Sequence, residues 1–310
     1  SSQYKHAVVI GGGLLGLEAA NGLKLRGMDV SVVHIGSWLL ERQMDKPASN
    51  LLQKSLEEKG LKFLLEKQTA ELLPLSPSPS PTGGEGSRSP SPSTGEGLGR
   101  GCAEDKPRVG AVKFKDGETV PADLVVMAVG IRPNTELAES AGLHCNRGLV
   151  VNDTLQSITD PRIYAVGECV NHRGIAYGLV APLFEQARVC ANHLAQHGVA
   201  RYQGSMTSTK LKVTGIDLFS AGEFMGGDGC EALVLRDPAE GVYKKLVLRG
   251  DRLVGACLYG DTADGAWYFD LIRQGRNIAA LRDRLIFGQA LAEPATAAAP
   301  AAPQPLPLAA

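Results

Sequence analysis

The stretch H-A-V-V-I-G-G-G-L-L-G-L-E-A-A-N-G-L-K-L-R-G-M-D-V-S-V-V, residues 6–33, decides the fold. It begins with a short apolar, β-branched run over 6–10 that ends in glycines. Helical spacing of apolar residues follows from Leu14 to Arg26 and stops at Gly27, and a second β-branched run covers 29–33. A strand, a helix and a strand in this order predict a βαβ unit, and therefore an α/β fold with a parallel sheet.

The glycines between the first strand and the helix predict a dinucleotide-binding loop. Gly11, Gly13 and Gly16 satisfy the spacing G-x-G-x-x-G. The first glycine permits a tight turn, the second lets the backbone approach a pyrophosphate, and the third allows close contact of helix and strand. Exposed N–H groups and the positive end of the helix dipole face the anion. We therefore expect this loop, with Gly12 and Leu15 inside it, to bind NAD(P)H.

The end of the second strand lacks the expected acid. A carboxylate that binds the adenosine ribose is expected about 20 residues beyond the loop, and His34 stands there. Histidine neither binds the ribose firmly nor repels a 2′-phosphate, so the choice between NAD and NADP stays open. Arg42 is either a ligand of that phosphate or a solvated surface residue. Glu18 is either a surface residue of the helix or one that faces the nicotinamide amide.

Composition excludes several classes of partner. The 310 residues carry 32 basic and 33 acidic side chains, a balance that attracts neither nucleic acid nor anionic lipid. Apolar runs are too short to span a bilayer and the N-terminus lacks the layout of a signal peptide, so we expect a cytoplasmic protein. The six cysteines form no C-x-x-C pair, and His193 and His197 lack a third ligand and are expected to be solvated. No metal site is predicted.

The remaining elements extend the same pattern. A helix that ends at Gly60 is followed by a strand over 61–65, a hairpin with strands over 109–115 and 118–120, and a buried strand over 124–128. Short strands and a helix near 267–274, with core aromatics over 267–269, predict a small α+β domain. The Ser/Pro/Gly-rich repeat 76–101 and the Ala/Pro-rich tail 291–310 are predicted to be disordered. The repeat enters a sheet at a turn, where each doubling of loop length costs only about 0.6 kcal/mol.

Three motifs in order carry a resemblance to a known family. They are A-V-V-I-G-G-G-L-L-G-L-E-A-A over 7–20, A-D-L-V-V-M-A-V-G-I-R-P-N over 122–134 and D-P-R-I-Y-A-V-G-E-C over 160–169. With them the chain resembles the pyridine nucleotide-disulfide oxidoreductase superfamily. Further stretches, L-L-E-R-Q-M-D over 39–45 and G-L-V-A-P-L-F-E-Q-A over 178–187, resemble its branch of assimilatory NAD(P)H nitrite reductase large subunits.

The resemblance implies two interleaved Rossmann-like domains. An NAD(P)-binding domain over 1–135 would be followed by the C-terminal part of an FAD-binding domain over 136–200 and the small α+β domain over 201–290. The first half of the FAD domain would precede this chain, and the siroheme and iron-sulfur centres would follow it. We therefore expect that the chain alone does not reduce nitrite.

The same resemblance assigns residues to the two cofactors. Gly130 would lie beside NAD(P)H, and Gly167 and Glu168 would meet the ribityl chain and phosphate of FAD. The segment 180–182, which includes Ala181, would open a helix that points at the pyrimidine edge of the flavin. The positive end of this helix would stabilise negative charge on the reduced ring.

The chemistry implied is hydride transfer from NAD(P)H to the flavin, which then passes electrons to a separate iron-sulfur or siroheme-type centre. Stacking and orientation supply most of such catalysis, so no acid-base pair is expected. The sequence lacks the C-x-x-x-x-C pair of the disulfide-reducing branch. Two alternatives stay open: an NAD(P)-binding remnant without flavin or activity, and a protein similar to NADH-dependent rubredoxin or ferredoxin reductases.

Overall fold

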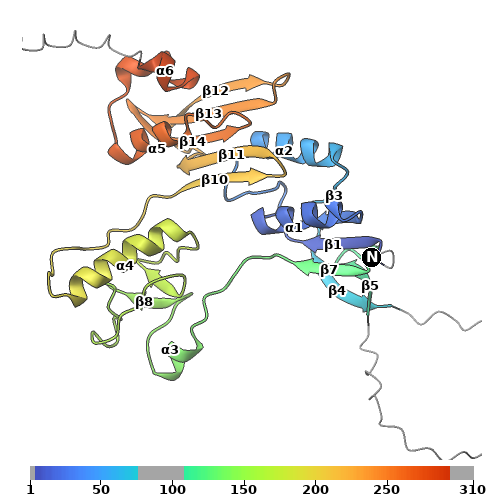
Figure 1. The fold of residues 1–310 in the computed structure, drawn as a ribbon, viewed down its shortest axis with the longest axis horizontal. Helices are drawn as coiled ribbons and strands as arrows, with labels where there is room; N and C mark the ends of the chain where they lie inside the picture. Colours follow the sequence, from blue (N-terminus) through green and yellow to red (C-terminus); the bar gives the residue numbers. More distant parts are fainter. Residues whose placement is uncertain (1–3, 76–107, 294–310) are drawn as a thin grey trace, which may run out of the picture. The chain divides into compact units, whose positions relative to one another are not determined.

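The computed structural model describes residues 4–75 and 108–293, which divide into two compact units (Figure 1). The first unit takes in Ser1–Leu39 and Gln53–Val129, and the second takes in Leu40–Leu52 and Gly130–Ala310. The segment Leu40–Leu52 therefore interrupts the first unit in sequence but packs with the second. The predicted disordered repeat 76–101 lies outside the described residues, and so does the predicted tail 291–310 from residue 294 onward. The first residues of that tail differ from the prediction, because Gln289–Ala292 forms a short helix in which Ala292 is buried.

A parallel sheet forms the centre of the first unit, with strand order β3-β2-β1-β7. Its elements are β1 (His6–Ile10), α1 (Leu14–Leu25), β2 (Asp29–Val33), β3 (Lys62–Leu64) and β7 (Leu124–Met127). Strand β1 pairs in parallel with both β2 and β7, and its last four residues are buried, as expected of a central strand. The predicted βαβ unit and the α/β fold class are confirmed.

A second, antiparallel sheet in the first unit has the order β4-β5-β6. Its strands are β4 (Thr69–Pro74), β5 (Val109–Phe114) and β6 (Thr119–Pro121). The predicted hairpin is confirmed as β5 and β6. Pro74 pairs with Val109, so the chain segments on either side of the Ser/Pro-rich repeat are adjacent antiparallel strands. The repeat therefore joins the sheet at a turn, as predicted, but strand β4 itself was not predicted. Apolar residues of both sheets share one core that includes Val8, Val112 and Phe114.

The C-terminal part of the second unit is a five-stranded antiparallel sheet with the order β10-β11-β14-β13-β12. Its elements are β10 (Ser208–Val213), β11 (Ile216–Gly222), β12 (Glu231–Asp237), β13 (Val242–Arg249), β14 (Arg252–Tyr259), α5 (Gly265–Gln274), η1 (Ala279–Leu281), η2 (Leu285–Phe287) and α6 (Gln289–Ala292). Helix α5 lies against this sheet (Figure 1). Tyr268 is fully buried in the core between them, and Trp267 and Phe269 pack against that core, so the predicted small α+β domain has its aromatic core.

The middle part of the second unit carries the other predicted site residues. Its elements are α3 (Glu136–Ser140), β8 (Leu149–Val151), β9 (Val170–His172) and α4 (Val180–Leu194). Strands β8 and β9 pair in parallel, and Leu149, Leu155, Val170 and Cys190 form a core with Tyr202. None of the helices described has both the length and the apolar character that crossing a bilayer requires.

A buried carboxylate attaches the segment Leu40–Leu52 to the C-terminal sheet. Asp45 is 4% exposed, accepts a hydrogen bond of 2.7 Å from the Tyr243 hydroxyl, and lies 3.3 Å from the Lys245 ammonium. It also accepts from the backbone N–H of Ala48 and so caps helix α2 (Lys46–Glu58). Because a buried charge is tolerated only when it is paired, these contacts hold the segment in one position.

Candidate functional site

The turn between β1 and α1 can be built only from glycine at two positions. Gly11 has φ +120°, and a Cβ added there would lie 2.2 Å from the Ala128 carbonyl oxygen. A Cβ on Gly16 would lie 1.9 Å from the Gly11 carbonyl oxygen. Gly13 differs, since its φ is −81° and a Cβ would meet no heavy atom within 4 Å. Internal packing therefore explains Gly11 and Gly16, whereas at Gly13 the missing side chain leaves open space above the loop.

Helix α1 presents uncapped backbone donors to this open space. Gly13 is its N-cap, no side chain among the described residues caps it, and the first turn holds no acidic residue. The helical ladder begins with the bond from Leu17 N–H to the Gly13 carbonyl, 3.0 Å long, so the preceding N–H groups point out of the helix end. Such an end attracts anions. The loop thus fits a diphosphate, the group that joins the two halves of a dinucleotide.

His34 supports the loop from its position at the end of β2. The Gly12 N–H donates to His34 Nδ1 at 3.2 Å, which fixes the neutral tautomer with its proton on Nε2. A Cβ on Gly12 would come within 2.7 Å of Leu39 and 2.9 Å of the His34 ring, so close packing also explains why glycine stands at this position. Sequence reasoning missed this contact. A contact of His34 with the ribose stays a prediction.

Four other residues predicted to lie at NAD(P)H are exposed. Leu15 and Glu18 lie on the exposed face of α1, Arg42 lies on the segment that packs with the second unit, and Gly130 begins the main part of that unit. The structure therefore brings together the glycines of the loop and His34. The roles of Leu15, Glu18, Arg42 and Gly130 in binding stay predictions.

The residues assigned to FAD gather in the second unit. Gly167 has φ +104°, a backbone conformation that favours glycine, and Glu168 beside it is exposed. A Cβ on Gly178 would lie 3.2 Å from Glu168 Oε1 and 3.9 Å from the Ile131 side chain. The segment that follows Gly130, the Gly167–Glu168 turn and the approach to α4 are therefore neighbours.

Helix α4 begins at this place with the same kind of open end as α1. Its N-cap, Leu179, makes no side-chain cap among the described residues, and its first turn holds no acid. Pro182 is buried, whereas Ala181 is exposed beside the helix end. Large apolar side chains in these segments are exposed: Ile131, Val166, Leu179, Val180 and Phe184. An apolar surface next to a helix N-terminus fits a flat ring that takes up negative charge.

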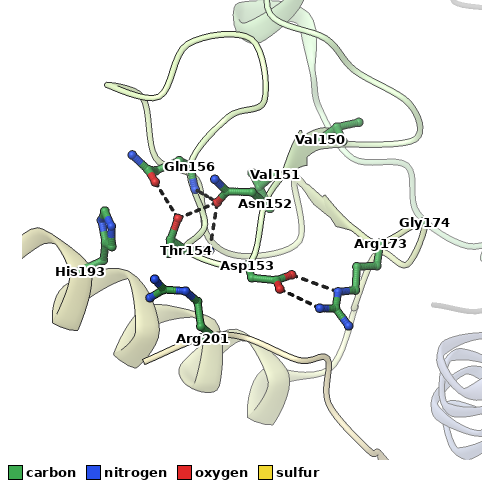
Figure 2. Close-up of a pocket in the computed structure, with 10 residues that line it drawn as sticks. All are labelled: Val150, Val151, Asn152, Asp153, Thr154, Gln156, Arg173, Gly174, His193 and Arg201. Atoms are coloured by element: carbon green, nitrogen blue, oxygen red, sulfur yellow. Dashed lines mark hydrogen bonds and ion pairs between the residues drawn. The ribbon is translucent and has the colours of Figure 1, made fainter. Parts of the chain in front are cut away.

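A pocket of about 670 Å³ lies elsewhere in the second unit, lined by β8, the loop after it and the end of α4 (Figure 2). Its polar groups bind one another. Asp153 accepts two hydrogen bonds from Arg173, which hold the pKa of that carboxyl below its usual value, and a third from His172. Thr154 bonds to its neighbours across the same loop. None of the predicted cofactor-binding residues lines this pocket.

The prediction of two solvated histidines is right for His197 and wrong for His193. His193 is half-buried, and its Nδ1 lies 2.6 Å from the Tyr164 hydroxyl, a residue far away in sequence. Across residues 4–75 and 108–293, no three potential metal ligands come together.

Models of known protein families match most of the chain. The family "Pyridine nucleotide-disulphide oxidoreductase" matches residues 6–74 and again 96–204. The "Rubredoxin NAD+ reductase C-terminal domain" matches residues 208–276. The chain belongs to the pyridine nucleotide-disulphide oxidoreductase family. The resemblance that the three motifs indicate is thus confirmed.

Relatives of this pyridine nucleotide-disulphide oxidoreductase include a nitrite reductase [NAD(P)H] of Bacillus subtilis, 49% identical over 90% of the chain and 31% of the relative. The assimilatory nitrate reductase electron transfer subunit of the same organism is 41% identical over 92% of the chain and 33% of the relative. The chain spans about a third of the length of these relatives. Among solved structures, the covalent putidaredoxin reductase-putidaredoxin complex matches with TM-score 0.68 and 25% identity, over 88% of this chain and 59% of that one.

Proposed function

We propose that this chain is the NAD(P)H- and FAD-binding electron-transfer part of a nitrite reductase large subunit. The observation that carries the proposal is the loop at Gly11–Gly16, where uncapped donors face an open space that packing does not explain. The 49% identity to a nitrite reductase [NAD(P)H] supports the rest. In this proposal residues 1–135 form the NAD(P) domain, residues 136–200 the rest of the FAD domain, and residues 201–290 the small α+β domain.

The chain's residues would bind and orient the cofactors. The loop from Gly11 to Gly16 would hold the diphosphate of NAD(P)H, and Gly167, Glu168 and the start of α4 would hold FAD. When bound, FAD supplies a hydride acceptor that releases electrons one at a time. The open N-terminus of α4 would favour negative charge at the ring. Catalysis by orientation assigns no acid-base role to any side chain.

The acceptor in this proposal is a separate redox centre of iron-sulfur or siroheme type. An electron transfer subunit among the relatives supports a separate acceptor. Because NAD(P)H would be the electron donor, we propose that the protein acts in the cytoplasm. Nitrite itself would not be reduced by this chain alone.

The proposal is tested with the purified full chain, incubated with FAD and then separated from free flavin by gel filtration. A yellow protein whose flavin absorbance bleaches on anaerobic addition of NADH or NADPH, and which then reduces ferricyanide, is the expected result. A colourless protein that still binds NAD(P)H would instead support the nucleotide-binding remnant. Turnover of nitrite with dithionite as reductant would contradict the separate acceptor.

A second candidate is a reductase of a small electron carrier. The match of residues 208–276 to the rubredoxin NAD+ reductase C-terminal domain favours it. The two candidates differ in the acceptor. Reduction of added rubredoxin as fast as ferricyanide would favour this second candidate over the nitrite reductase part.

A further inference from the structure

Helix α4 carries a polar side chain in the middle of its buried face. Pro182, Gln186 and Cys190 form this face at intervals of four residues, and Gln186 is 0% exposed. Burying an amide costs free energy unless hydrogen bonds replace those to water. An apolar residue would pack at this position without that cost, so packing alone does not explain why a glutamine stands here.

The Gln186 amide bonds to the turn assigned to FAD. Its Oε1 accepts a hydrogen bond of 2.9 Å from the backbone N–H of Gly167. The Gly167 carbonyl in turn accepts from the Val170 N–H at 3.1 Å, at the start of β9. Both polar groups of the Gly167 backbone are thus engaged, and its φ of +104° is held from two sides.

The other end of the Gln186 amide faces a second buried group. Its Nε2 is buried and has no partner of hydrogen-bond geometry in the described parts of the chain. Burial raises the pKa of the Tyr202 hydroxyl, and the Gln186 amide is among the neighbouring groups that act on it. The same hydroxyl is 2.7 Å from Ser205 Oγ. Gly167 is therefore the group to which Gln186 makes its hydrogen bond.

We propose that Gln186 is a positioning residue, which fixes the Gly167–Glu168 turn against the N-terminal half of α4. This inference rests on the proposed function, because those are the two segments proposed to hold FAD. Gln186 lies under the turn and acts through the Gly167 backbone. Without its acceptor oxygen, the turn would lose its fixed distance from the helix end, and the two would no longer present one preformed surface.

Two substitutions of Gln186 separate its hydrogen bond from its packing. Gln186→Met keeps an unbranched side chain of similar length but removes the acceptor. Gln186→Glu keeps an oxygen at the same distance, and burial without a cationic partner raises the pKa of the new carboxyl, so that it remains neutral at about pH 6. Cys190→Ala is the matched control, because it changes the same buried face one turn further on.

The first measurement is amide hydrogen exchange at Gly167 in the full chain, which needs no cofactor. We expect the Gly167 amide to exchange at least about ten-fold faster in Gln186→Met than in the wild type. Gln186→Glu and Cys190→Ala should exchange like the wild type. Equal protection of Gly167 in Gln186→Met and the wild type would overturn the inference, whether or not FAD binds.

The second measurement compares binding of FAD with binding of NADH. We expect Gln186→Met to bind FAD about ten-fold more weakly and NADH unchanged, and Gln186→Glu to regain FAD affinity as the pH falls toward 6. Unchanged FAD affinity in Gln186→Met, or an equal loss of both ligands, would overturn the positioning role while the proposed function stands. A wild type that takes up no FAD would overturn the proposed function, and the exchange result alone then decides the inference.

Discussion

The substitution Gly13→Ala tests the dinucleotide loop with little damage to the fold. The new methyl group would meet no heavy atom of the protein within 4 Å, and the backbone angles of Gly13, φ −81° and ψ −179°, are open to alanine. The cost to folding is therefore confined to the N-cap position, where alanine is worse than glycine by at most about 1 kcal/mol. The methyl group instead fills the space through which a diphosphate reaches the helix end.

The expected loss of binding follows from the contacts at that end. A diphosphate pushed away from the loop loses roughly one hydrogen bond to a charged group, worth about 1.5–3 kcal/mol. Since 1.4 kcal/mol is about a factor of ten in affinity, Gly13→Ala should weaken NADH binding about ten- to hundred-fold. Calorimetry measures the affinity, and thermal melting verifies that the fold is intact.

Two other glycines of α1 provide the controls. Gly22 also has open space around an added Cβ, but it lies in the helix interior away from the loop. Gly22→Ala should leave NADH affinity unchanged and stabilise the helix by roughly 0.5–1 kcal/mol. Gly16→Ala should damage the fold, because its Cβ would collide with the Gly11 carbonyl. A folded Gly13→Ala variant that binds NADH as well as the wild type would refute the seating of the diphosphate over this loop.

Three further predictions concern the C-terminal sheet. Tyr243→Phe removes a hydrogen bond to the buried Asp45 carboxylate and should lower the free energy of unfolding by about 1.5–3 kcal/mol in urea; no change would show that Asp45 needs no such partner. A hydrogen bond from Lys244 lowers the pKa of Asp261, so its contribution is complete above about pH 4 and is lost as the pH falls through the lower folded-state pKa. Acid unfolding should therefore be less steep in Asp261→Asn, and identical acid curves would contradict the pairing. Burial raises the pKa of Cys257 to about 12, so iodoacetamide should modify it only in unfolded protein, as measured by mass spectrometry; labelling in the native state would contradict its burial.

Local patterns were enough to predict most of the first unit. The βαβ unit follows from the spacing of apolar residues and from glycines at the ends of its elements, all within a few residues of one another. The hairpin follows from the turn Asp116–Gly117, where Gly117 has φ +90°. Strand β4 was missed because T-A-E-L-L-P over 69–74 shows no alternation and ends in proline. The segment forms a strand because it pairs with β5, whose sequence lies beyond the inserted repeat. Distant pairing of this kind leaves no local pattern.

The glycines of the site could be predicted, but the side chains that support them could not. His34 and Gly12 are 22 residues apart, and Gln186 and Gly167 are 19 apart, spacings that no helix or strand repeat connects. A signal for Gln186 did exist, since it is a polar residue on the buried face of α4. Gln186 can be recognised as unusual only after the structure shows which face of α4 is buried. The sequence therefore predicts where the cofactor loops are, and the fold shows what holds them.

The two side chains that hold the glycine turns, His34 and Gln186, both accept a hydrogen bond without carrying a negative charge. In each unit a glycine turn donates one backbone N–H to a neutral side-chain acceptor, His34 Nδ1 at Gly12 and Gln186 Oε1 at Gly167. Each turn lies next to a helix N-terminus without an acid in its first turn. An ionised carboxylate would satisfy the same N–H, but it would also repel a phosphate that approaches these open donors. A neutral acceptor satisfies the turn and leaves the positive helix end available to the anion. At residue 34 an imidazole nitrogen thus supports the loop, at the position where dinucleotide-binding loops usually carry a carboxylate for the ribose.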